Sequence, residues 1–215
     1  LKNLQGRLAK SIILPLSYFD YETWVADRSG VVQRVLKEMA PEKTLIVRSS
    51  AMDEDGFNVA NAGRYHSELD VSASLDAVSA AIDKVFNSYG KPQPGDQVLV
   101  QPQLENVKAS GVIFTRQLAT GAPYYVLNYT EDGDTTAITS GAVAEGVKIF
   151  VLRNASLRHI AQLPGNARLL LEAAKEIETS VFHDALDIEF AIFDDNQVAT
   201  LQCRPLMLDD DHQDR

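Results

Sequence analysis

The most constraining feature of this 215-residue sequence is segment 187–206, DIEFAIFDDNQVATLQCRPL. Two runs rich in apolar and β-branched residues flank a short polar stretch, which is the pattern of a β-hairpin. Asp195 and Asn196 are predicted to form a two-residue loop, because Asp and Asn tolerate the positive φ angles that such loops require. This loop fixes the register of the two strands.

The predicted register places Glu189 opposite Gln202 and Asp187 opposite Arg204. Side chains alternate between the two faces of a strand, so these four lie on the same face of the hairpin. The other face is expected to belong to the core, with these residues: Ile188, Phe190, Leu201 and Cys203.

The polar face of the hairpin suits a metal and a phosphate. A carboxylate beside an amide oxygen offers the hard oxygen ligands that Mg²⁺ prefers, and Mg²⁺ commonly keeps waters and substrate phosphates as its other ligands. Arg204 can bind a phosphate through two parallel hydrogen bonds. The alternative is an exposed sheet face with a salt bridge worth at most about 1 kcal/mol, and the hairpin by itself favours that alternative slightly.

A second polar cluster, RSSAMDED at 48–55, overlaps the end of the apolar run TLIVR and precedes NAGRYHSEL at 61–69. Arg48 ends a predicted strand beside two serine hydroxyls, and Gly63 allows backbone N–H groups to approach a ligand closely. A phosphate-facing loop is one interpretation, and an ordinary polar loop is the other. The sequence contains neither a Walker A pattern nor a G-x-G-x-x-G pattern.

Helical periodicity is clearest in residues 74–90, where Ser74 is a candidate N-cap and Gly90 a candidate terminator. Segments 31–40 and 167–182 show the same periodicity. Short runs typical of strands occupy these residues: 44–48, 97–101, 110–115, 124–129 and 148–153.

The order of these elements predicts an α+β fold. The strands after residue 95 follow one another with short turns and one intervening helix, which favours a mostly antiparallel sheet in the second half. The chain is predicted to be a single domain over 1–206. One lobe covers about 1–95 with the RSS loop, the other covers about 96–206 with the hairpin, and 207–215 is an acidic tail.

Composition narrows the class of protein. The net charge of -10 argues against nucleic-acid binding, which depends on clustered Lys and Arg. Cys203 is the only cysteine, so no internal disulfide can form, and no apolar run approaches the roughly 20 residues of a membrane span. A cytoplasmic protein without membrane attachment is expected. Because the sequence begins LKNLQG without methionine, a fragment of a longer chain is also expected.

Several blocks occur in a fixed order: RSSAMDED with AGRYHSEL, VLVQPQL, SGVIFTRQLATG, and DIEFAIF with LQCRPL. Together they resemble the ATP-binding domain of phosphoenolpyruvate synthase and pyruvate phosphate dikinase, and glucan water dikinase and rifampicin phosphotransferase are similar. The resemblance covers roughly residues 44–206. It implies an ATP-grasp fold with ATP and Mg²⁺ between two lobes, and a phosphotransferase that passes a phosphoryl group to a histidine on a separate domain. From there the group moves to pyruvate or another acceptor on an acceptor-binding domain.

The resemblance also implies roles for individual residues. Arg48 and Arg204 would hold phosphates, and Glu189 and Gln202 would bind Mg²⁺. Asp187 would position Arg204 or a metal-bound water. The expected catalytic set is therefore the two arginines with Asp187.

Three more residues match the family near the nucleotide. Gly63 and Ser67 match the loop that covers the phosphates, and Gln101 matches the segment near the adenine. Departures from the family pattern also occur: the usual N-terminal lysine has no good counterpart, Leu118 replaces a proline, and residues 124–146 differ from the usual adenine and ribose segment.

These departures keep three functions open. The first is the Mg-ATP-binding domain of a phosphoenolpyruvate synthase-like phosphotransferase, incomplete as this fragment. The second is a compact ATP-grasp kinase or ligase-like enzyme with another small-molecule acceptor. The third is a degenerate module that keeps the fold and binds a partner. The sequence determines neither the final acceptor nor the oligomeric state.

Overall fold

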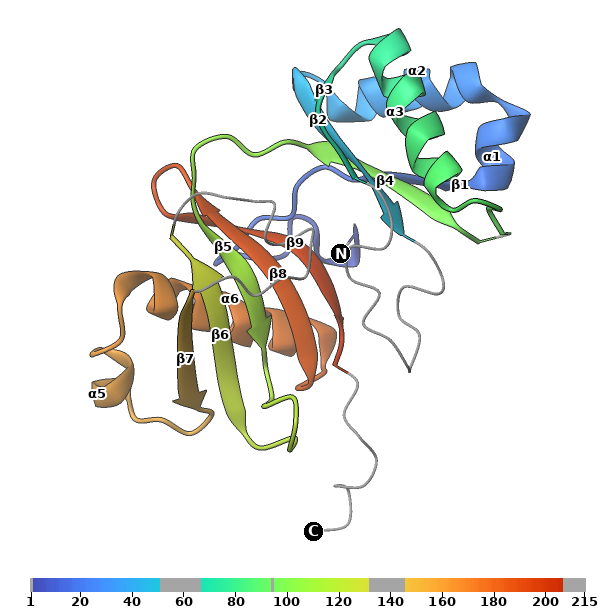
Figure 1. Ribbon diagram of the computed structural model, residues 1–215. Coiled ribbons are helices and arrows are strands. Elements are labelled where there is room, and N and C mark those ends of the chain that lie inside the picture. The colour runs from blue at the N-terminus through green and yellow to red at the C-terminus, as the bar shows by residue number, and fades with distance from the viewer. Residues whose placement is uncertain (1, 51–66, 94, 132–145, 207–215) are drawn as a thin grey trace. The chain divides into compact units, whose positions relative to one another are not determined.

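The computed structural model describes residues 2–50, 67–93, 95–131 and 146–206. It divides into two compact units, one between residues 14 and 104 and one that combines the residues up to 13 with those from 105 onward. Both contain helices and an antiparallel sheet (Figure 1). The predicted α+β class and the antiparallel sheet of the second half are confirmed. The predicted lobe limits, about 1–95 and about 96–206, stay a prediction, and the acidic tail lies outside the described residues.

The unit between residues 14 and 104 is built on a four-stranded sheet in the order β1-β4-β2-β3. Its strands are β1 (Ser17–Asp20), β2 (Thr44–Ser50), β3 (Ser67–Ser72) and β4 (Gln97–Pro102). Its helices are α1 (Tyr21–Ala26), α2 (Arg28–Met39) and α3 (Leu75–Ser88). The helices and the sheet enclose one apolar core, in which Trp24 is fully buried.

The helix predicted over 74–90 is present as α3, with both of its predicted ends. Ser74 Oγ accepts a hydrogen bond from Ala77 N at 3.4 Å and begins α3. Gly90, with φ +70°, follows the last turn and takes the left-handed conformation that a terminating glycine supplies. Between them, the buried positions follow helical spacing: Val78, Ala81, Ile82, Val85 and Phe86.

The second unit carries a five-stranded sheet in the order β7-β6-β5-β8-β9. Its strands are β5 (Val107–Phe114), β6 (Tyr124–Thr130), β7 (Val147–Leu152), β8 (Leu186–Phe193) and β9 (Gln197–Pro205). Its helices are the 3-10 turn η1 (Lys2–Leu4), α5 (Leu157–Ile160) and α6 (Gly165–Val181). No helix in the described part of the chain is long and apolar enough to cross a membrane.

Helix α6 covers one face of the five-stranded sheet (Figure 1). Its apolar side, including Leu170 and Ile177, packs on Leu127, Ile188 and Phe190 of the sheet, each at most 1% exposed. Burial of such side chains contributes roughly 1.5–3 kcal/mol each. The apolar side chains at alternate positions of β8 therefore face α6. The polar side chains between them, Asp187 and Glu189, lie on the opposite face of the sheet.

The N-terminal segment belongs to this second unit. Ile12 forms a parallel bridge with Ala199 of β9, and Glu176 of α6 accepts hydrogen bonds from Ala9 N and Lys10 N, both at 2.8 Å. Lys10 Nζ pairs with Glu172 at 2.9 Å, and this hydrogen bond raises the pKa of Lys10. Lys10 is therefore engaged by α6.

The sequence did not predict β1 and β3. Strand β1 has only four residues, and β3 buries only Val71 fully, so neither gives a clear alternation of apolar and polar residues. Both are edge strands, held by pairing with β4 and β2. Their strand conformation depends on neighbours that are distant in sequence.

Candidate functional site

Strands β8 and β9 form the hairpin predicted over residues 187–206. The predicted pairs Glu189 with Gln202 and Asp187 with Arg204 are both present. The predicted two-residue loop is wrong, because Phe193 pairs with Gln197 and the loop therefore covers 194–196.

A second irregularity restores the predicted register near the site. The register shifts by one between Glu189 and Phe190, so Phe190 faces Thr200, where Leu201 was expected. Leu201 is half-buried at this β-bulge. The loop is one residue longer than predicted and shifts the strand pairing by one residue. The bulge shifts the pairing back by one residue, so the pairs Glu189 with Gln202 and Asp187 with Arg204 agree with the prediction.

Glu189 and Gln202 belong to a row of directly paired residues that crosses the whole sheet. Direct strand pairing joins Gln202 to Glu189, then to Val112 of β5, Asn128 of β6 and Lys148 of β7. Directly opposed residues share a face, so the row lies on the face away from α6. We call this face of the second unit the site face.

Asp187 and Arg204 form the neighbouring pair on the site face. Arg204 Nε donates a hydrogen bond to Asp187 Oδ2 at 2.9 Å, with side-chain exposures of 37% and 13%. An ion pair with one half-buried partner restricts the guanidinium to a narrow range of orientations. The hydrogen bond thus holds the guanidinium of Arg204 beside Asp187.

The position of Cys203 shows which face of the sheet each β9 side chain occupies. It lies between Gln202 and Arg204 in sequence and packs against the apolar core on the α6 side. Burial raises the pKa of its thiol to about 11. Since only the thiolate reacts, the fraction that can be alkylated grows as pH rises toward that value.

We expect iodoacetamide to modify Cys203 of the folded protein at pH 8 at least roughly a hundredfold more slowly than an ordinary cysteine with a pKa near 8.5. Urea-unfolded protein, which exposes the thiol, should react at the ordinary rate. The absence of any other cysteine makes mass spectrometry a direct readout. Fast labelling of the folded chain at pH 8 contradicts the assigned orientation of β9.

Arg48 and Ser67 lie on one sheet of the other unit. Arg48 is inside β2 and pairs directly with Ser67, the first residue of β3. The same row continues through Leu99 to Tyr18 on β1. The prediction that Ser67 belongs to a loop is therefore wrong. The third residue of this group, Gly63, lies outside the described residues.

Gln101 of β4 lies on the same face as Arg48, since it pairs with Ile46, two residues before Arg48 in β2. Its side chain is 5% exposed, and within the described residues Nε2 donates no hydrogen bond. A shielded donor without an acceptor costs about 1–3 kcal/mol, so a ligand atom that accepts a hydrogen bond would satisfy it. The ring nitrogens of a nucleotide base have that property.

The donor set on the site face fits Mg²⁺ as a partner of phosphate. Among the described residues, no group of three or more His, Cys, Asp and Glu side chains can hold a metal ion. The site face instead opposes one carboxylate, Glu189, to one amide, Gln202. Mg²⁺ in nucleotide sites typically takes one or two protein oxygens and completes its shell with waters and phosphates, which matches this pair.

Asn128 and Lys148 are site-face residues that the sequence did not indicate. A usable signal was present, because Asn128 is an isolated amide inside the apolar run YYVLNYT. The run gave no visible alternation, since β6 is buried on both faces over most of its length. Only the strand pairing shows that Asn128 shares a row with Glu189.

The sequence matches no protein-family model and no curated protein. Among solved structures, it is similar to a dinucleotide-forming acetyl-coenzyme A synthetase 1 from Ca. Korarchaeum cryptofilum, solved in complex with coenzyme A, Ca-AMPCP and HgCl⁺. The TM-score is 0.55 at 10% identity, over 91% of this chain and 86% of that one. The chain has an ATP-grasp-like fold.

Two further ATP-grasp-like neighbours are longer proteins. The D-alanine-D-alanine ligase from Helicobacter pylori aligns at 14% identity and TM-score 0.48, with coverage of 91% of this chain and 49% of that chain. The N5-carboxyaminoimidazole synthetase from Staphylococcus aureus, complexed with ADP, aligns at 11% identity and TM-score 0.41, with coverage of 93% and 42%. This ATP-grasp-like chain thus spans about half the length of the ligase.

Proposed function

We propose that this chain is the Mg-ATP-binding domain of a phosphotransferase of the phosphoenolpyruvate synthase and pyruvate phosphate dikinase type. The observation that carries the proposal is the pairing of Glu189 with Gln202 and of Asp187 with Arg204 on one face of the sheet. Metal ligands and a phosphate-binding cation are then neighbours, as phosphoryl transfer requires. The ATP-grasp-like fold is consistent with this function.

Each residue has a defined task in this proposal. Glu189 and Gln202 hold the metal, which neutralises charge on the phosphates when it is bound. Asp187 orients the guanidinium of Arg204, whose η nitrogens bind a phosphate. Arg48 is proposed to bind phosphate as well, assisted by these residues: Gly63 and Ser67. Gln101 donates a hydrogen bond to the adenine.

The acceptor of the phosphoryl group is proposed to be a histidine on a separate domain, which passes it to pyruvate or another molecule on an acceptor-binding domain. His159 and His183 each use Nδ1 in a local contact. His183 Nδ1 accepts a hydrogen bond from Ala185 N at 3.0 Å, and His159 Nδ1 lies 3.2 Å from Ser156 Oγ. A carrier domain, in the same chain or in another, completes the cycle, and the cytoplasm is the proposed location.

Arg204→Ala is expected to weaken ATP binding roughly 10- to 100-fold, because hydrogen bonds to charged groups contribute about 1.5–3 kcal/mol. AMP affinity should change less than about threefold, since AMP lacks the phosphates that Arg204 contacts. Isothermal titration of both nucleotides with Mg²⁺ measures the two changes in the same protein preparation. The matched control is Arg168→Ala, which removes an exposed arginine from α6. Equal losses for ATP and AMP in Arg204→Ala reject the phosphate-binding role.

A second candidate is an ATP-grasp enzyme that activates a different small-molecule acceptor. The fold similarity to an acetyl-coenzyme A synthetase supports it as well as it supports the first proposal. Incubation with ATP labelled with ³²P at both the β and γ positions, together with a phosphohistidine carrier domain, separates the two candidates. Acid-labile, base-stable label on the carrier supports the dikinase type, and label that appears only on a small molecule supports the second candidate.

A further inference from the structure

The β-bulge of the hairpin lies directly beside the proposed metal-binding pair. Phe190 faces Thr200 and Glu189 faces Gln202, so Leu201 of β9 has no residue of its own opposite it in β8. A bulge disrupts the ladder of hydrogen bonds locally, bends the strand that carries the extra residue and increases its twist. The bend of β9 therefore falls immediately before Gln202.

The bulge is not needed to bring the polar pairs together. If Leu201 were absent, the pairing of Phe190 with Thr200 would continue without a break into the pairing of Glu189 with Gln202. Side chains alternate along a regular strand, so Gln202 would still share the face of Glu189. A regular hairpin thus gives the same pairs on the same face, and it keeps the ladder that the bulge disrupts.

Packing around β9 does not account for the bulge either. Cys203 packs on the apolar core under α6, whereas Leu201 is not among the described side chains that pack on this core. The N-terminal segment pairs with β9 through Ile12, whose N donates to Val198 O at 2.8 Å and whose O accepts from Thr200 N at 2.9 Å. Both hydrogen bonds lie before Leu201. The bulge is therefore explained neither by the core nor by the N-terminal segment.

The bulge does change the direction in which Gln202 projects relative to Glu189. In a regular antiparallel pair, two opposed side chains rise side by side with Cβ atoms about 4.5–5.5 Å apart. A bend and extra twist on one strand alone turn its side chain relative to the opposite one. Mg²⁺ demands nearly ideal octahedral geometry, whereas Ca²⁺ accepts flexible geometry and longer bonds. The relative direction of two oxygen ligands therefore affects Mg²⁺ more than Ca²⁺.

We propose that the bulge at Leu201 aims the amide of Gln202 for Mg²⁺ and so sets a preference of the site for Mg²⁺ over Ca²⁺. The proposal deepens the proposed function and rests on it. Leu201 is then a positioning residue, because it acts through the path of the β9 backbone. Glu189, on the strand without the extra residue, supplies the carboxylate against which the amide is aimed.

The test deletes Leu201 and measures the dissociation constants of Mg-ATP and Ca-ATP by isothermal titration. The parent chain should prefer Mg-ATP, and the deletion should reduce that preference roughly tenfold, which corresponds to about 1.4 kcal/mol. Leu201→Ala is the matched control, because it shortens the side chain and keeps the extra residue. Its preference for Mg-ATP should stay within about twofold of the parent's, even if both affinities change together.

Melting temperatures without ligand separate a positioning role from a structural one. Both variants lose the same half-buried side chain, and only the deletion regains a regular ladder. The deletion variant should therefore melt no lower than Leu201→Ala. If it melts lower or does not fold, the bulge serves the fold and the proposal is overturned.

The titrations also distinguish failure of this proposal from failure of the proposed function. An unchanged preference in a folded deletion variant overturns the role of the bulge, and so does an equal reduction in Leu201→Ala. A parent chain that binds both complexes equally well keeps the proposed function and overturns only the role of the bulge. A parent chain that binds neither complex refutes the proposed function, and the role of the bulge with it.

Discussion

Replacing Glu189 by alanine is expected to abolish Mg²⁺-dependent ATP binding and to leave the fold intact. With ATP at about 100 times its dissociation constant, the parent chain should gain roughly 2.7 kcal/mol of stability, a rise in melting temperature of roughly 5–10 °C. Glu189→Ala removes the carboxylate of the metal pair, so this rise should vanish. Without ligand its melting temperature should stay close to that of the parent, because a half-buried sheet-face glutamate contributes little to stability.

The control for this experiment is Glu172→Ala, which removes a carboxylate of α6 whose salt bridge with Lys10 is about half exposed on both sides. Its Mg-ATP stabilisation should equal that of the parent. A full ligand-induced shift in Glu189→Ala rejects the metal assignment. A shift that is absent from the parent and the control as well rejects nucleotide binding by this chain.

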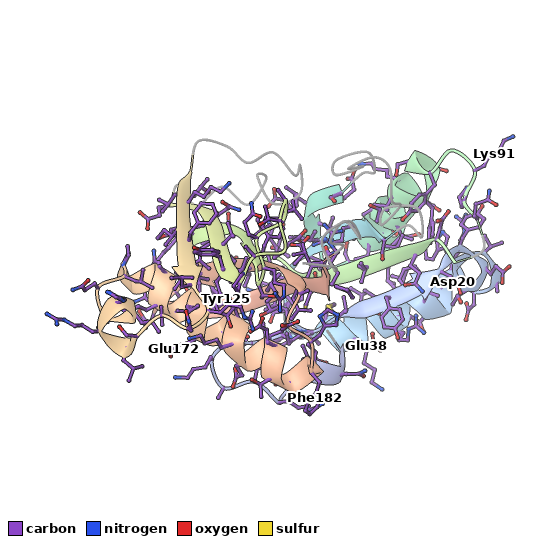
Figure 2. The ribbon with its side chains drawn as sticks, turned by 90° about the horizontal axis from the view of Figure 1, so that it is seen from below. Asp20, Glu38, Lys91, Tyr125, Glu172 and Phe182 are labelled. Carbon is purple, nitrogen blue, oxygen red and sulfur yellow. The ribbon has the colours of Figure 1, made fainter. Side chains whose placement is uncertain are left out.

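Glu178→Ala is expected to cause the largest loss of stability among the polar substitutions considered. Glu178 lies on α6 and is 7% exposed, and its carboxylate accepts hydrogen bonds from Arg153 at 2.6 and 3.1 Å and from Tyr125 Oη at 2.6 Å. Figure 2 shows Tyr125 on the sheet side of α6, with Phe182 beyond the end of the helix. Burial and the hydrogen bond to Glu178 raise the pKa of Tyr125, so its hydroxyl stays a donor.

Loss of this carboxylate leaves the hydroxyl of Tyr125 without its acceptor and the guanidinium of Arg153 without its ion-pair partner, although Arg153 keeps a hydrogen bond to Thr115 O at 2.8 Å. Breaking such a pair costs about 3–5 kcal/mol, which corresponds to roughly 6–20 °C in melting temperature. Chemical denaturation and calorimetry both measure the change. Glu172→Ala, on the same helix with an exposed pair, should cost at most about 1 kcal/mol.

A compensating double variant separates the charge effect from packing. Arg153→Met combined with Glu178→Leu replaces the ion pair by apolar side chains, a change that is often neutral in other proteins. It should recover most of the stability lost in Glu178→Ala. If Glu178→Ala costs no more than Glu172→Ala, the buried network does not stabilise the sheet against α6.

The β8–β9 hairpin shows how far local patterns reach. Alternation in DIEFAIF and LQCRPL predicted the two polar pairs correctly, although the predicted loop was one residue too short. The β-bulge after Glu189 offset that difference. Turn length and bulges depend on how both strands pack in the full sheet, so the sequence around Asp195 did not reveal them.

Ser67 and Asn128 show where local patterns fail. Ser67 was predicted in a loop and lies in edge strand β3, whose conformation comes from pairing with β2. Asn128 lies in a strand that is apolar on both sides, so no periodicity identified its face. Their placement depends on strand pairing, which brings Ser67 beside Arg48 and places Asn128 in the same row as Glu189 only after folding.

The sequence by itself determined the α+β class, the principal helices, the antiparallel second half and the polar pairs of the hairpin. These follow from periodicity, helix caps and strand alternation, which act between residues close in the chain. Only the tertiary structure decided that Asn128 and Lys148 extend the row of Glu189, and that Glu178, Arg153 and Tyr125 form one buried network. Those relations come from β5 pairing between β6 and β8 and from α6 packing on the sheet, contacts between segments that no local pattern connects.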